Sequence, residues 1–315
     1  MRCIVTGCAG FIGSHVAKVL LEQEHEVLGI DDFSTGSLKN VDWSGLNNVE
    51  HSAIQTFSAF KMVAKFKPDW VFHLAAKPRV QYSVAEPVLT HESNVNGTLN
   101  LLEACRLHDV KRVVYSSSSS VYGNQYLLPI KEDVKLNPLS PYALQKLTGE
   151  TYAKIYYDVY RLPTVSLRYF NVYGARQDPN GDYAAAIPKF VLQILRNKPV
   201  TIFGDGEQTR DFTYIHDVVN ANLLAAVSPY ALGKVFNIGG GENTSVVDLI
   251  NLIIKELKDI NDSPLIQYLD PVVESRHTLA DISEAREILK WEPSVSFAEG
   301  LKKTVQDMKK EYKND

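Results

Sequence analysis

The feature that most constrains the fold is a glycine-rich turn near the N-terminus that joins a strand to a helix. Residues 2–6 are a short apolar run that suits a buried parallel strand. The turn 7–13 follows with the spacing G-x-x-G-x-x-G, and residues 14–24 have the periodicity of an amphipathic helix. A second apolar run, 27–30, ends in a pair of acids at 31–32. This order of strand, glycine turn, helix, strand and acid is typical of a dinucleotide-binding unit.

The chemistry of this unit favours one kind of cofactor. Glycines let the backbone approach a pyrophosphate, and the helix N-terminus offers free N–H groups and a favourable dipole. An acid such as Asp31 or Asp32 accepts hydrogen bonds from a ribose and repels a 2′-phosphate, which favours NAD over NADP. Because the spacing differs from the usual G-x-G-x-x-G, a tight strand–helix turn without a ligand stays an alternative.

Strand-like and helix-like segments continue to alternate through the first half of the chain. Strands are expected at 48–54, 70–76, 112–115 and 164–168, and helices at 56–66, 88–107 and 142–160. The segment 33–48 is rich in Ser, Gly, Asn and Thr and is expected to be a loop over a cofactor. We interpret His73, a lone histidine in an apolar run, as a core residue. The alternation predicts an α/β fold with a doubly wound parallel (Rossmann) sheet and right-handed crossovers.

A second signal lies around the third of these strands. The hydroxyl-rich run 116–120 follows it, and Tyr142 and Lys146 then stand at i and i+4 of the next helix, on one face. A tyrosine has a pKa of about 10 and needs a shift of about 3 units to act as a base near pH 7. An adjacent ammonium and a cationic cofactor ring supply such a shift by charge proximity. Tyr-x-x-x-Lys alone also arises from core packing, so its weight comes from the serine run and the N-terminal turn.

The pattern changes after residue 170. We expect an NAD-binding domain at 1–170, with a returning segment near 212–240, and an interleaved, smaller α/β substrate-binding domain at 171–315. Helices are expected at 187–196, 246–257 and 297–312, and strands at 201–206 and 235–238. The glycine triplet 239–241 is interpreted as a turn rather than a second phosphate loop, because no acid follows at the right distance.

Composition excludes several classes of protein. The net charge of −4 and the pI near 6.1 argue against nucleic-acid and anionic-membrane partners. The three cysteines, Cys3, Cys8 and Cys105, have no paired spacing, so neither a disulfide framework nor a metal site is implied. The sequence begins directly with a strand and has no apolar run of membrane-spanning length, so we expect a cytoplasmic protein.

Together these motifs resemble the extended short-chain dehydrogenase/reductase family, and within it the NAD-dependent nucleotide-sugar 4-epimerases. The resemblance covers nearly the whole chain. Its pieces are the turn 7–13, the segments 72–76, 94–98 and 167–171, the run around Ser118, Tyr142 with Lys146, and the segments 210–212 and 280–281.

The resemblance implies a role for each central residue. Tyr142 would be the base on the sugar 4-hydroxyl, and Ser118 would hydrogen-bond the same oxygen. Lys146 would bind the nicotinamide ribose and depress the pKa of Tyr142. Hydride would leave C4 and return to the other face of a 4-keto sugar, so that NAD is regenerated in each cycle. Asn171 and Arg210 would hold the diphosphate, and the fork of arginine suits phosphate.

The resemblance also implies two sets of contacts. Those to the cofactor are expected from Gly7, Gly10, Phe11, Ile12, Gly13, Asp31, Asp32, Phe33, Ser34, Gly36, Leu74, Ala75, Ala76, Asn94, Ser116, Tyr142, Lys146 and Phe170. Those to the UDP-sugar are expected from Lys77, Ser83, Ser118, Tyr142, Asn171, Arg210, Arg276 and Thr278. No metal ligand is implied.

Residues at four positions restrict the type of reaction and the sugar that the resemblance implies. Similar 4,6-dehydratases have Asp-Glu where this chain has Ser119 and Ser120, and similar decarboxylases have Glu at the second position. The chain therefore looks limited to oxidation and reduction at C4. Similar glucuronate epimerases usually have Thr in place of Asn171, which favours a hexose or N-acetylhexosamine. Thr278 stands at the position that sets the size of the sugar pocket in similar enzymes. Its side chain is small, which favours tolerance of an N-acetyl group.

The chain departs from the family pattern at two places, and alternative functions stay open. Ala53 and Ile54 replace the acid that usually ends the third strand near adenine, and the segment 271–274 before Arg276 lacks the usual motif. Arg276 is either a phosphate ligand or a surface residue. Alternative functions are an epimerase or reductase of another nucleotide sugar, uronic or deoxy, and a non-catalytic NAD-binding regulator. Family members often dimerise through the helices that here span 88–107 and 142–160, as a four-helix bundle.

Overall fold

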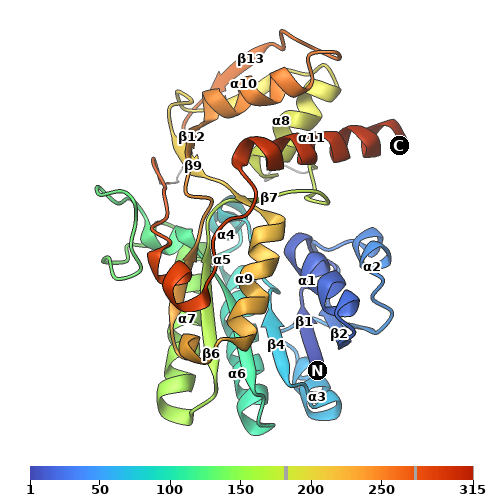
Figure 1. The fold of residues 1–315 in the computed structure, drawn as a ribbon, viewed down its shortest axis with the longest axis vertical. Coiled ribbons are helices and arrows are strands. Elements are labelled where there is room, and N and C mark those ends of the chain that lie inside the picture. The colour runs from blue at the N-terminus through green and yellow to red at the C-terminus, as the bar shows by residue number, and fades with distance from the viewer. Residues whose placement is uncertain (181–183, 273–274, 315) are drawn as a thin grey trace.

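A seven-stranded parallel sheet forms the centre of the molecule. The computed structural model describes residues 1–180, 184–272 and 275–314 (Figure 1). The strands lie in the order β11 (Val235–Ile238), β6 (Thr164–Tyr169), β5 (Arg112–Ser118), β4 (Trp70–His73), β1 (Arg2–Thr6), β2 (Glu26–Asp31) and β3 (Val49–His51). All neighbouring pairs are parallel. The predicted doubly wound α/β sheet is confirmed, and the strand order reverses between β1 and β4.

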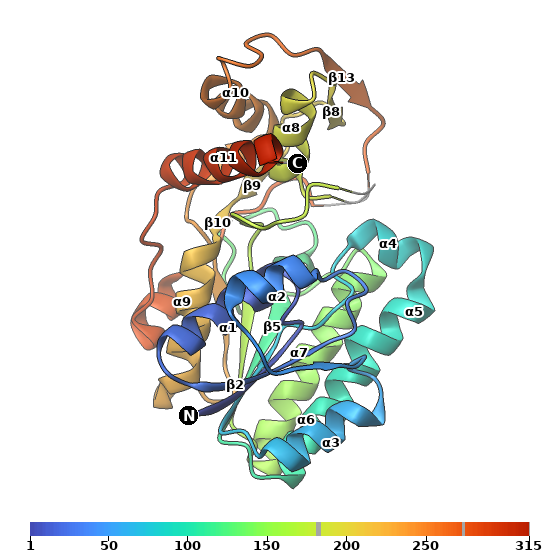
Figure 2. The same cartoon turned by 90° about the vertical axis from the view of Figure 1, so that its right-hand side faces the viewer.

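Helices cover both faces of this sheet (Figure 2). One face carries α1 (Phe11–Glu22) and α9 (Ile215–Val227), and the other carries α3 (Phe57–Phe66), α6 (Gly97–Leu107) and α7 (Pro141–Tyr160). Each face has its own cluster of buried apolar side chains. The strands are accordingly buried on both faces, which explains their nearly continuous apolar runs.

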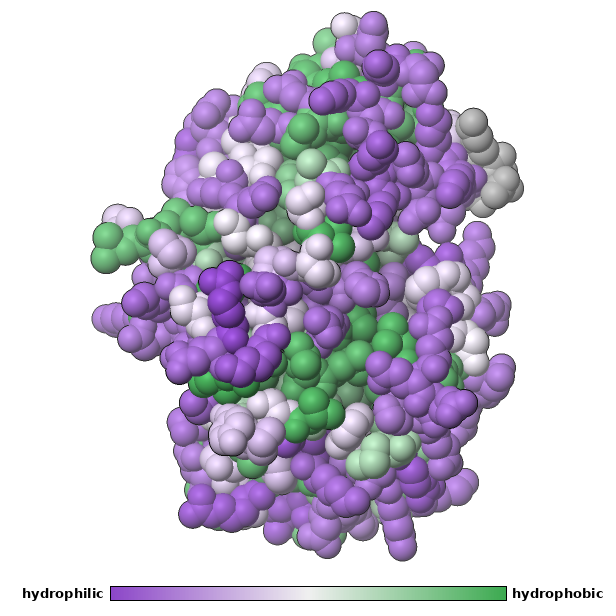
Figure 3. Space-filling model, in the orientation of Figure 1, coloured by the Kyte–Doolittle hydropathy of each residue, from purple (hydrophilic) through white to green (hydrophobic). Residues whose placement is uncertain are grey.

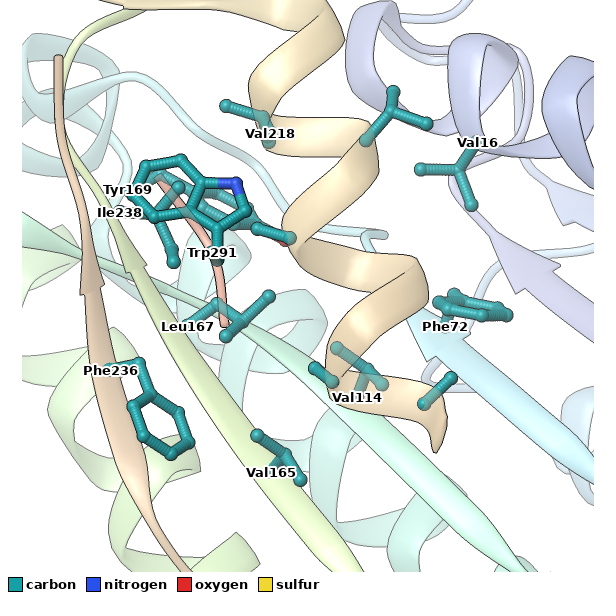
Figure 4. Close-up of a cluster of buried hydrophobic side chains, with 14 of the residues drawn as sticks. Val16, Phe72, Val114, Val165, Leu167, Tyr169, Val218, Phe236, Ile238 and Trp291 are labelled. Atoms are coloured by element: carbon teal, nitrogen blue, oxygen red, sulfur yellow. The ribbon is translucent and has the colours of Figure 1, made fainter. Parts of the chain in front are cut away.

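Figure 4 shows how the first of these clusters is assembled. Val16 of α1 and Val218 of α9 face strand side chains such as Val114 and Leu167, and Trp291 closes the cluster from a distant segment. The Trp291 indole donates a hydrogen bond to the carbonyl oxygen of Asp217 at 2.9 Å, so its polar atom is satisfied. Burial of such a side chain contributes about 1.5–3 kcal/mol, which makes this cluster a main source of stability.

The structure differs from the predicted helices in three places. The expected loop 33–48 contains α2 (Leu38–Ser44), which Ser37 caps by accepting a hydrogen bond from the Lys39 N–H. The expected helix 88–107 is divided into α5 (Pro87–His91), a π-helical turn (Glu92–Asn96) and α6, and α4 (Val80–Ala85) precedes it. Helix α9 was not predicted, because small residues and asparagines dilute its apolar periodicity.

The second half of the chain builds a smaller region beyond the carboxyl ends of the sheet strands (Figures 1 and 2). Its helices are α8 (Ala186–Leu195), α10 (Val246–Glu256) and α11 (Phe297–Asn314), which share a third apolar cluster. Its strands pair as β8 (Val200–Phe203) with β13 (Ile266–Leu269), β9 (Thr209–Asp211) with β12 (Asn243–Ser245), and β7 (Val172–Tyr173) with β10 (Thr213–Tyr214). Strand β11 and helix α9 return to the main sheet.

The surface is mostly polar on the face shown in Figure 3, with apolar side chains gathered over α9 and on a projecting segment at the left. This segment follows the 3-10 turn Ser119–Tyr122 (Figure 1), and its Tyr126 and Leu127 are exposed. Of the helices in the described part of the chain, none combines the length and apolarity needed to cross a membrane.

Candidate active site

A cleft of about 1700 Å³ lies between the carboxyl ends of the main strands and the smaller region. Ligands of open α/β sheets bind at this edge, where the strand order reverses. The cleft is larger than the roughly 300–1,000 Å³ of a typical small-molecule pocket. Its size therefore suits two nucleotide-sized molecules side by side.

The glycine turn forms the floor of one half of the cleft. Gly7 ends β1 with φ +71°, and a Cβ on it would lie 2.8 Å from the Ala75 backbone nitrogen. A Cβ on Gly13 would collide with the Gly7 carbonyl. Helix α1 begins after Gly10, which supplies no capping side chain, so the first-turn N–H groups stay available at the cleft. The close backbone packing and the free N–H groups form an anion-binding helix N-terminus.

The two acids after β2 have different surroundings. Asp31 is buried and accepts hydrogen bonds from the backbone N–H groups of Ala9 at 2.9 Å and Phe33 at 2.8 Å, and burial raises its pKa. Asp32 is more exposed and accepts from Ser34, with the Lys77 ammonium 3.4 Å away. Burial alone would raise the pKa of Asp32, but these donors hold it below its usual value. Both carboxylates line the cleft, Asp31 held by backbone N–H groups and Asp32 held by Ser34 and Lys77.

The serine run lies on a strand rather than on the expected loop. Ser116 to Ser118 extend β5, whose register pairs Ser118 with Tyr169, and the 3-10 turn starts at Ser119. The Ser118 hydroxyl oxygen accepts hydrogen bonds from the Ser120 N–H at 3.2 Å and from the Ser120 hydroxyl at 2.9 Å. Strand geometry therefore holds the Ser118 hydroxyl in a fixed position at the cleft.

Helix α7 presents Tyr142 and Lys146 to the same place. Ser140 caps the helix by accepting from the Ala143 N–H at 3.2 Å, and Pro141 occupies the first turn. The Lys146 ammonium donates to the Ser116 carbonyl at 2.6 Å, and burial lowers its pKa to about 7. Burial raises the pKa of Tyr142 to about 12, and a hydrogen bond with Ser118 partly offsets this.

This pKa differs from the expectation that Lys146 depresses the pKa of Tyr142. The Lys146 charge is itself disfavoured by burial, and its ammonium is bound to the Ser116 carbonyl rather than to the phenol. Ser118 lowers the pKa of Tyr142, and the effect of burial outweighs it.

Most of the predicted site residues line this one cleft. Those expected at the cofactor are Gly7, Gly10, Phe11, Ile12, Gly13, Asp31, Asp32, Ser34, Gly36, Leu74, Ala75, Ala76, Ser116, Tyr142 and Lys146. Those expected at the UDP-sugar are Lys77, Ser118, Tyr142, Asn171, Arg210 and Thr278. Residues as far apart in sequence as Gly7 and Thr278 are thus brought together.

Five predicted residues lie outside the lining. The Phe33 ring packs edge-on against His51, and the Phe170 side chain is fully buried beside Tyr122. Asn94 is buried. Its amide oxygen accepts a hydrogen bond from the Lys77 N–H at 2.7 Å, and its amide nitrogen donates to the Lys77 carbonyl at 3.2 Å.

The other two predicted residues, Ser83 and Arg276, interact with other groups of the protein. Ser83 is buried and accepts a hydrogen bond from the Tyr142 N–H at 3.0 Å, so it supports the start of α7. Arg276 is exposed and forms an ion pair with Asp205 at 2.7 Å, as a surface arginine does. Residues 273 and 274, part of the departure noted before Arg276, lie outside the described residues.

Two features of the cleft were missed or left open by the sequence. Arg176 lines the cleft and donates to Asn40 of α2, a contact that no local pattern signals. Near the end of β3, where the sequence lacks the acid that is usual in similar proteins, Ser52 and Ile54 line the cleft. His73 is a core residue, as interpreted, with both ring nitrogens hydrogen-bonded to threonines, at 2.8 Å to Thr6 and 2.9 Å to Thr98. Among the described residues, no cluster of three His, Cys, Asp or Glu is arranged to hold a metal ion.

Comparison with known proteins gives consistent results. The model of the family described as NAD dependent epimerase/dehydratase family matches residues 3–239. A UDP-glucose 4-epimerase from Thermotoga maritima, solved with UDP-glucose, is 39% identical with a TM-score of 0.93, over 99% of this chain and 100% of that one.

Two further solved structures are similar over almost the whole chain. A UDP-N-acetylglucosamine 4-epimerase from Methanobrevibacter ruminantium, in complex with UDP-N-acetylmuramic acid, is 38% identical with a TM-score of 0.92, over 98% of each chain. A UDP-glucuronic acid 4-epimerase from Bacillus cereus, in complex with UDP-glucuronic acid and NAD, is 37% identical with a TM-score of 0.91, over 99% of this chain and 100% of that one.

Proposed function

The chain belongs to the NAD dependent epimerase/dehydratase family, and from this premise we propose that it is an NAD-dependent UDP-sugar 4-epimerase acting on a hexose or N-acetylhexosamine. One observation carries the proposal. Tyr142, Lys146 and Ser118 meet in the same cleft as the open N-terminus of α1. A base for an alcohol and a site for a dinucleotide are therefore side by side.

The residues present fit NAD. The first-turn N–H groups of α1 suit a pyrophosphate, and the carboxylates of Asp31 and Asp32 suit a ribose. Backbone packing at Gly7 leaves no room for a side chain at the turn. When bound, NAD supplies the hydride acceptor and donor and the positive ring charge. Lys146, buried below the cleft, is the residue proposed to hold the nicotinamide ribose.

The side chains of the protein handle the proton. Tyr142 is proposed to take the proton from the sugar 4-hydroxyl and to return it after the 4-keto sugar has turned over. Ser118 is proposed to hydrogen-bond the same oxygen, because its hydroxyl lies beside Tyr142 at the cleft. Ser119 and Ser120 carry no acid or base for dehydration or decarboxylation.

The far side of the cleft is proposed to hold the UDP-sugar. Arg210 and Asn171 face it and suit the diphosphate, and Thr278 lies beside them with a small side chain. This supports room for an N-acetyl group. We further propose that residues 1–170, with the returning segment 212–240, hold NAD, and that most of 171–315 holds the UDP-sugar.

A second candidate function is 4-epimerisation of a UDP-uronic acid. Its support is the similarity to the UDP-glucuronic acid 4-epimerase, which is nearly as high as that to the UDP-glucose enzyme. Asn171, where glucuronate epimerases usually have Thr, favours the first candidate.

A proton NMR time course tests both. The purified protein is incubated separately with UDP-glucose, UDP-N-acetylglucosamine and UDP-glucuronic acid, without and with added NAD. Formation of the 4-epimer of either of the first two supports the proposal, and the faster one identifies the role of Thr278. Turnover of UDP-glucuronic acid alone favours the second candidate, and no turnover with NAD present rejects both.

We also propose a cytoplasmic homodimer. Its support is the exposed apolar side chains on α5 and α7, such as Val88, Leu144 and Val159, together with three cysteines that are all buried and free. Sedimentation velocity at micromolar concentration is expected to give a dimer, and Leu144→Glu is expected to give a monomer. A wild-type monomer contradicts the dimer.

A further inference from the structure

The carboxylate of Asp211 joins three separate segments of the chain. It is fully buried at the end of β9 and accepts hydrogen bonds from three backbone N–H groups. These belong to Gly240 at 2.6 Å, Gly241 at 3.3 Å and Ala280 at 2.9 Å. Hydrogen bonds to an ionised acceptor are roughly twice as strong as neutral ones. One side chain therefore fixes β9, the glycine triplet after β11 and the segment around Ala280 relative to one another.

The glycine triplet 239–241 is built around this carboxylate. A Cβ on Gly239 would lie 2.6 Å from Asp211 Oδ2, and one on Gly240 would collide with the Phe212 carbonyl. Gly241 has φ +78°, a left-handed conformation that favours glycine. Two N–H groups of the triplet donate hydrogen bonds to the Asp211 carboxylate. The triplet is thus an anion-binding turn whose anion is a side chain of the same protein.

Residues of the UDP-sugar half of the cleft surround Asp211. Arg210 precedes it in β9 and lines the cleft. The Asn171 amide donates to the Asp211 carbonyl at 2.9 Å, and the Asp211 N–H lies 3.5 Å from the Thr278 hydroxyl oxygen. By contrast, Tyr142 and Lys146 are placed by α7 and β5. Asp211 is therefore connected to the residues proposed to bind substrate and not to those proposed to move the proton.

We propose that Asp211 is a positioning residue for UDP-sugar binding. Its buried carboxylate fixes the main chain of β9, which carries Arg210 and to which Asn171 and Thr278 are hydrogen-bonded. The inference rests on the proposed function, since it assigns these three residues to the substrate. It predicts that loss of the Asp211 charge weakens UDP-sugar binding and leaves the proton chemistry intact.

The pH dependence of binding follows from the surroundings of Asp211. Burial raises its pKa to about 6 against the lowering effect of its N–H donors, and Glu242 before β12 raises it further. Other charged or titratable groups lie on the segments joined here: Arg210 on the same strand, His277, which is bonded to Thr209 at 2.9 Å, Arg276 before it, and Asp281 next to Ala280. A protonated carboxyl has fewer acceptor positions. Binding is therefore expected to be full at pH 8 and to weaken as the pH falls through about 6.

Calorimetry with UDP-glucose on the NAD-loaded protein tests the inference. Both phosphates of UDP-glucose are esterified, so the ligand does not titrate between pH 5 and 8. Asp211→Asn keeps the shape and removes the charge. At pH 8 it is expected to raise the Kd for UDP-glucose about tenfold or more. In turnover assays KM is expected to rise similarly while kcat changes much less.

Asp217→Asn is the matched control. Asp217 is also buried, and its Oδ1 accepts from the Ser294 N–H at 2.9 Å and hydroxyl at 2.6 Å, away from the cleft. Both variants lose a buried carboxylate, so both are expected to lose stability, but only Asp211→Asn is expected to lose affinity. Equal affinity losses in the two variants, or none in Asp211→Asn, overturn the inference.

The wild-type protein gives an independent measurement that does not depend on a variant folding. Its Kd for UDP-glucose is expected to rise from pH 8 to pH 5 with a midpoint near 6, and a flat profile overturns the inference. If the wild-type protein binds and epimerises a UDP-sugar and Asp211→Asn binds it with the same Kd, the inference is refuted but the proposed function is not. A wild-type protein that binds no UDP-sugar refutes the proposed function, and the inference with it.

Discussion

At the scale of single residues, the surroundings of Tyr142 determine the pKa of its phenol. Burial raises the pKa of this phenol to about 12, although Ser118 hydrogen-bonds it. A base that works near pH 7 needs a lower pKa. Positive charge near the phenol, from the Lys146 ammonium and from the ring of a bound NAD, favours the phenolate and lowers this pKa.

The variant Tyr142→Phe tests this role. Removal of the phenolic hydroxyl is expected to lower kcat about 10²- to 10⁴-fold, because proton transfer loses its base. NAD retention and the Kd for UDP-glucose are expected to change little, since the ring remains. NMR turnover and calorimetry measure the two effects. Ser119→Ala, at a hydroxyl of the same run, is the control, and unchanged turnover in Tyr142→Phe would exclude it as the base.

His73 is a residue whose titration affects stability rather than catalysis. Thr98 donates its own proton to the Asn94 carbonyl at 2.7 Å, so the His73 Nε2 carries a proton. Thr6 accepts from the Leu74 and Ala75 N–H groups and donates to Nδ1, which is consistent with a neutral ring. Burial, with the Lys146 charge, lowers the pKa of His73 to about 3. The unfolded chain therefore binds a proton below about 6.5 that the folded chain does not, so stability is lost as the pH falls from 6.5 toward 3.

The expected contribution of His73 is about 1.4 kcal/mol per pH unit within this window. Urea unfolding of the wild type and of His73→Asn at pH 7 and pH 5 measures it. The variant should show a shallower decline between the two pH values than the wild type. His15, whose pKa burial lowers to about 4, contributes in both proteins and cancels in the comparison. Parallel declines would show that His73 is not the titrating group.

At the scale of elements, α7 depends on its first turn. Ser140 caps the helix, and Ser83 accepts from the N–H of Tyr142 at 3.0 Å, so two serines satisfy N–H groups that the helix itself leaves open. Tyr142 therefore stands in the first turn of the helix, which is prone to fraying, and the two serines stabilise this turn.

The cap gives a prediction for this helix. Ser140→Ala is expected to lower the free energy of unfolding by about 1 kcal/mol, and Ser140→Asp, which keeps an acceptor, by much less. Chemical denaturation measures both. The kcat of Ser140→Ala is expected to fall only slightly, because Ser83 still holds the Tyr142 N–H. Equal stability of the Ala and Asp variants would mean that the hydrogen bond to Ala143 contributes nothing.

At the scale of the whole molecule, Arg176 connects segments that lie far apart in sequence. It donates to Asn40 at 3.0 Å and to the Lys39 carbonyl at 3.0 Å, both on α2, and pairs with Glu311 on α11 at 3.3 Å. Its guanidinium also lies 5.2 Å from the centre of the Trp43 ring. Arg176 thus ties the region beyond the sheet to the helix beside the glycine turn, at the edge of the cleft.

Arg176→Ala is expected to loosen the hold on the cofactor. Loss of these hydrogen bonds and of the cation–π contact should raise the Kd for NAD about tenfold. The NAD that stays with the protein through gel filtration measures this without any turnover. Lys309→Ala, which removes an exposed pair with Asp259, is the control. Equal retention by both variants would show that Arg176 does not act on the cofactor.

The sequence by itself determined the central sheet, because the information is local. Apolar runs, glycines and helix periodicity occur within a few residues of one another, and they identified β1, β2, β4, β5, β6 and β11 and the helices α1, α3, α7, α8, α10 and α11. The same local patterns marked Tyr142, Lys146 and Ser118. They failed at α2 and α9, where polar or small residues hide a helix that tertiary packing stabilises.

Only the tertiary structure decided which marked residues face the cleft. Phe170 and Asn94 stand in motifs as distinctive as those of Arg210, but core packing and backbone hydrogen bonds turn them away. The structure also gave the glycine triplet 239–241 its partner, Asp211, and set the pKa values of Tyr142 and Lys146 through burial. Burial, charge and contact depend on residues distant in sequence, so no local pattern contains them.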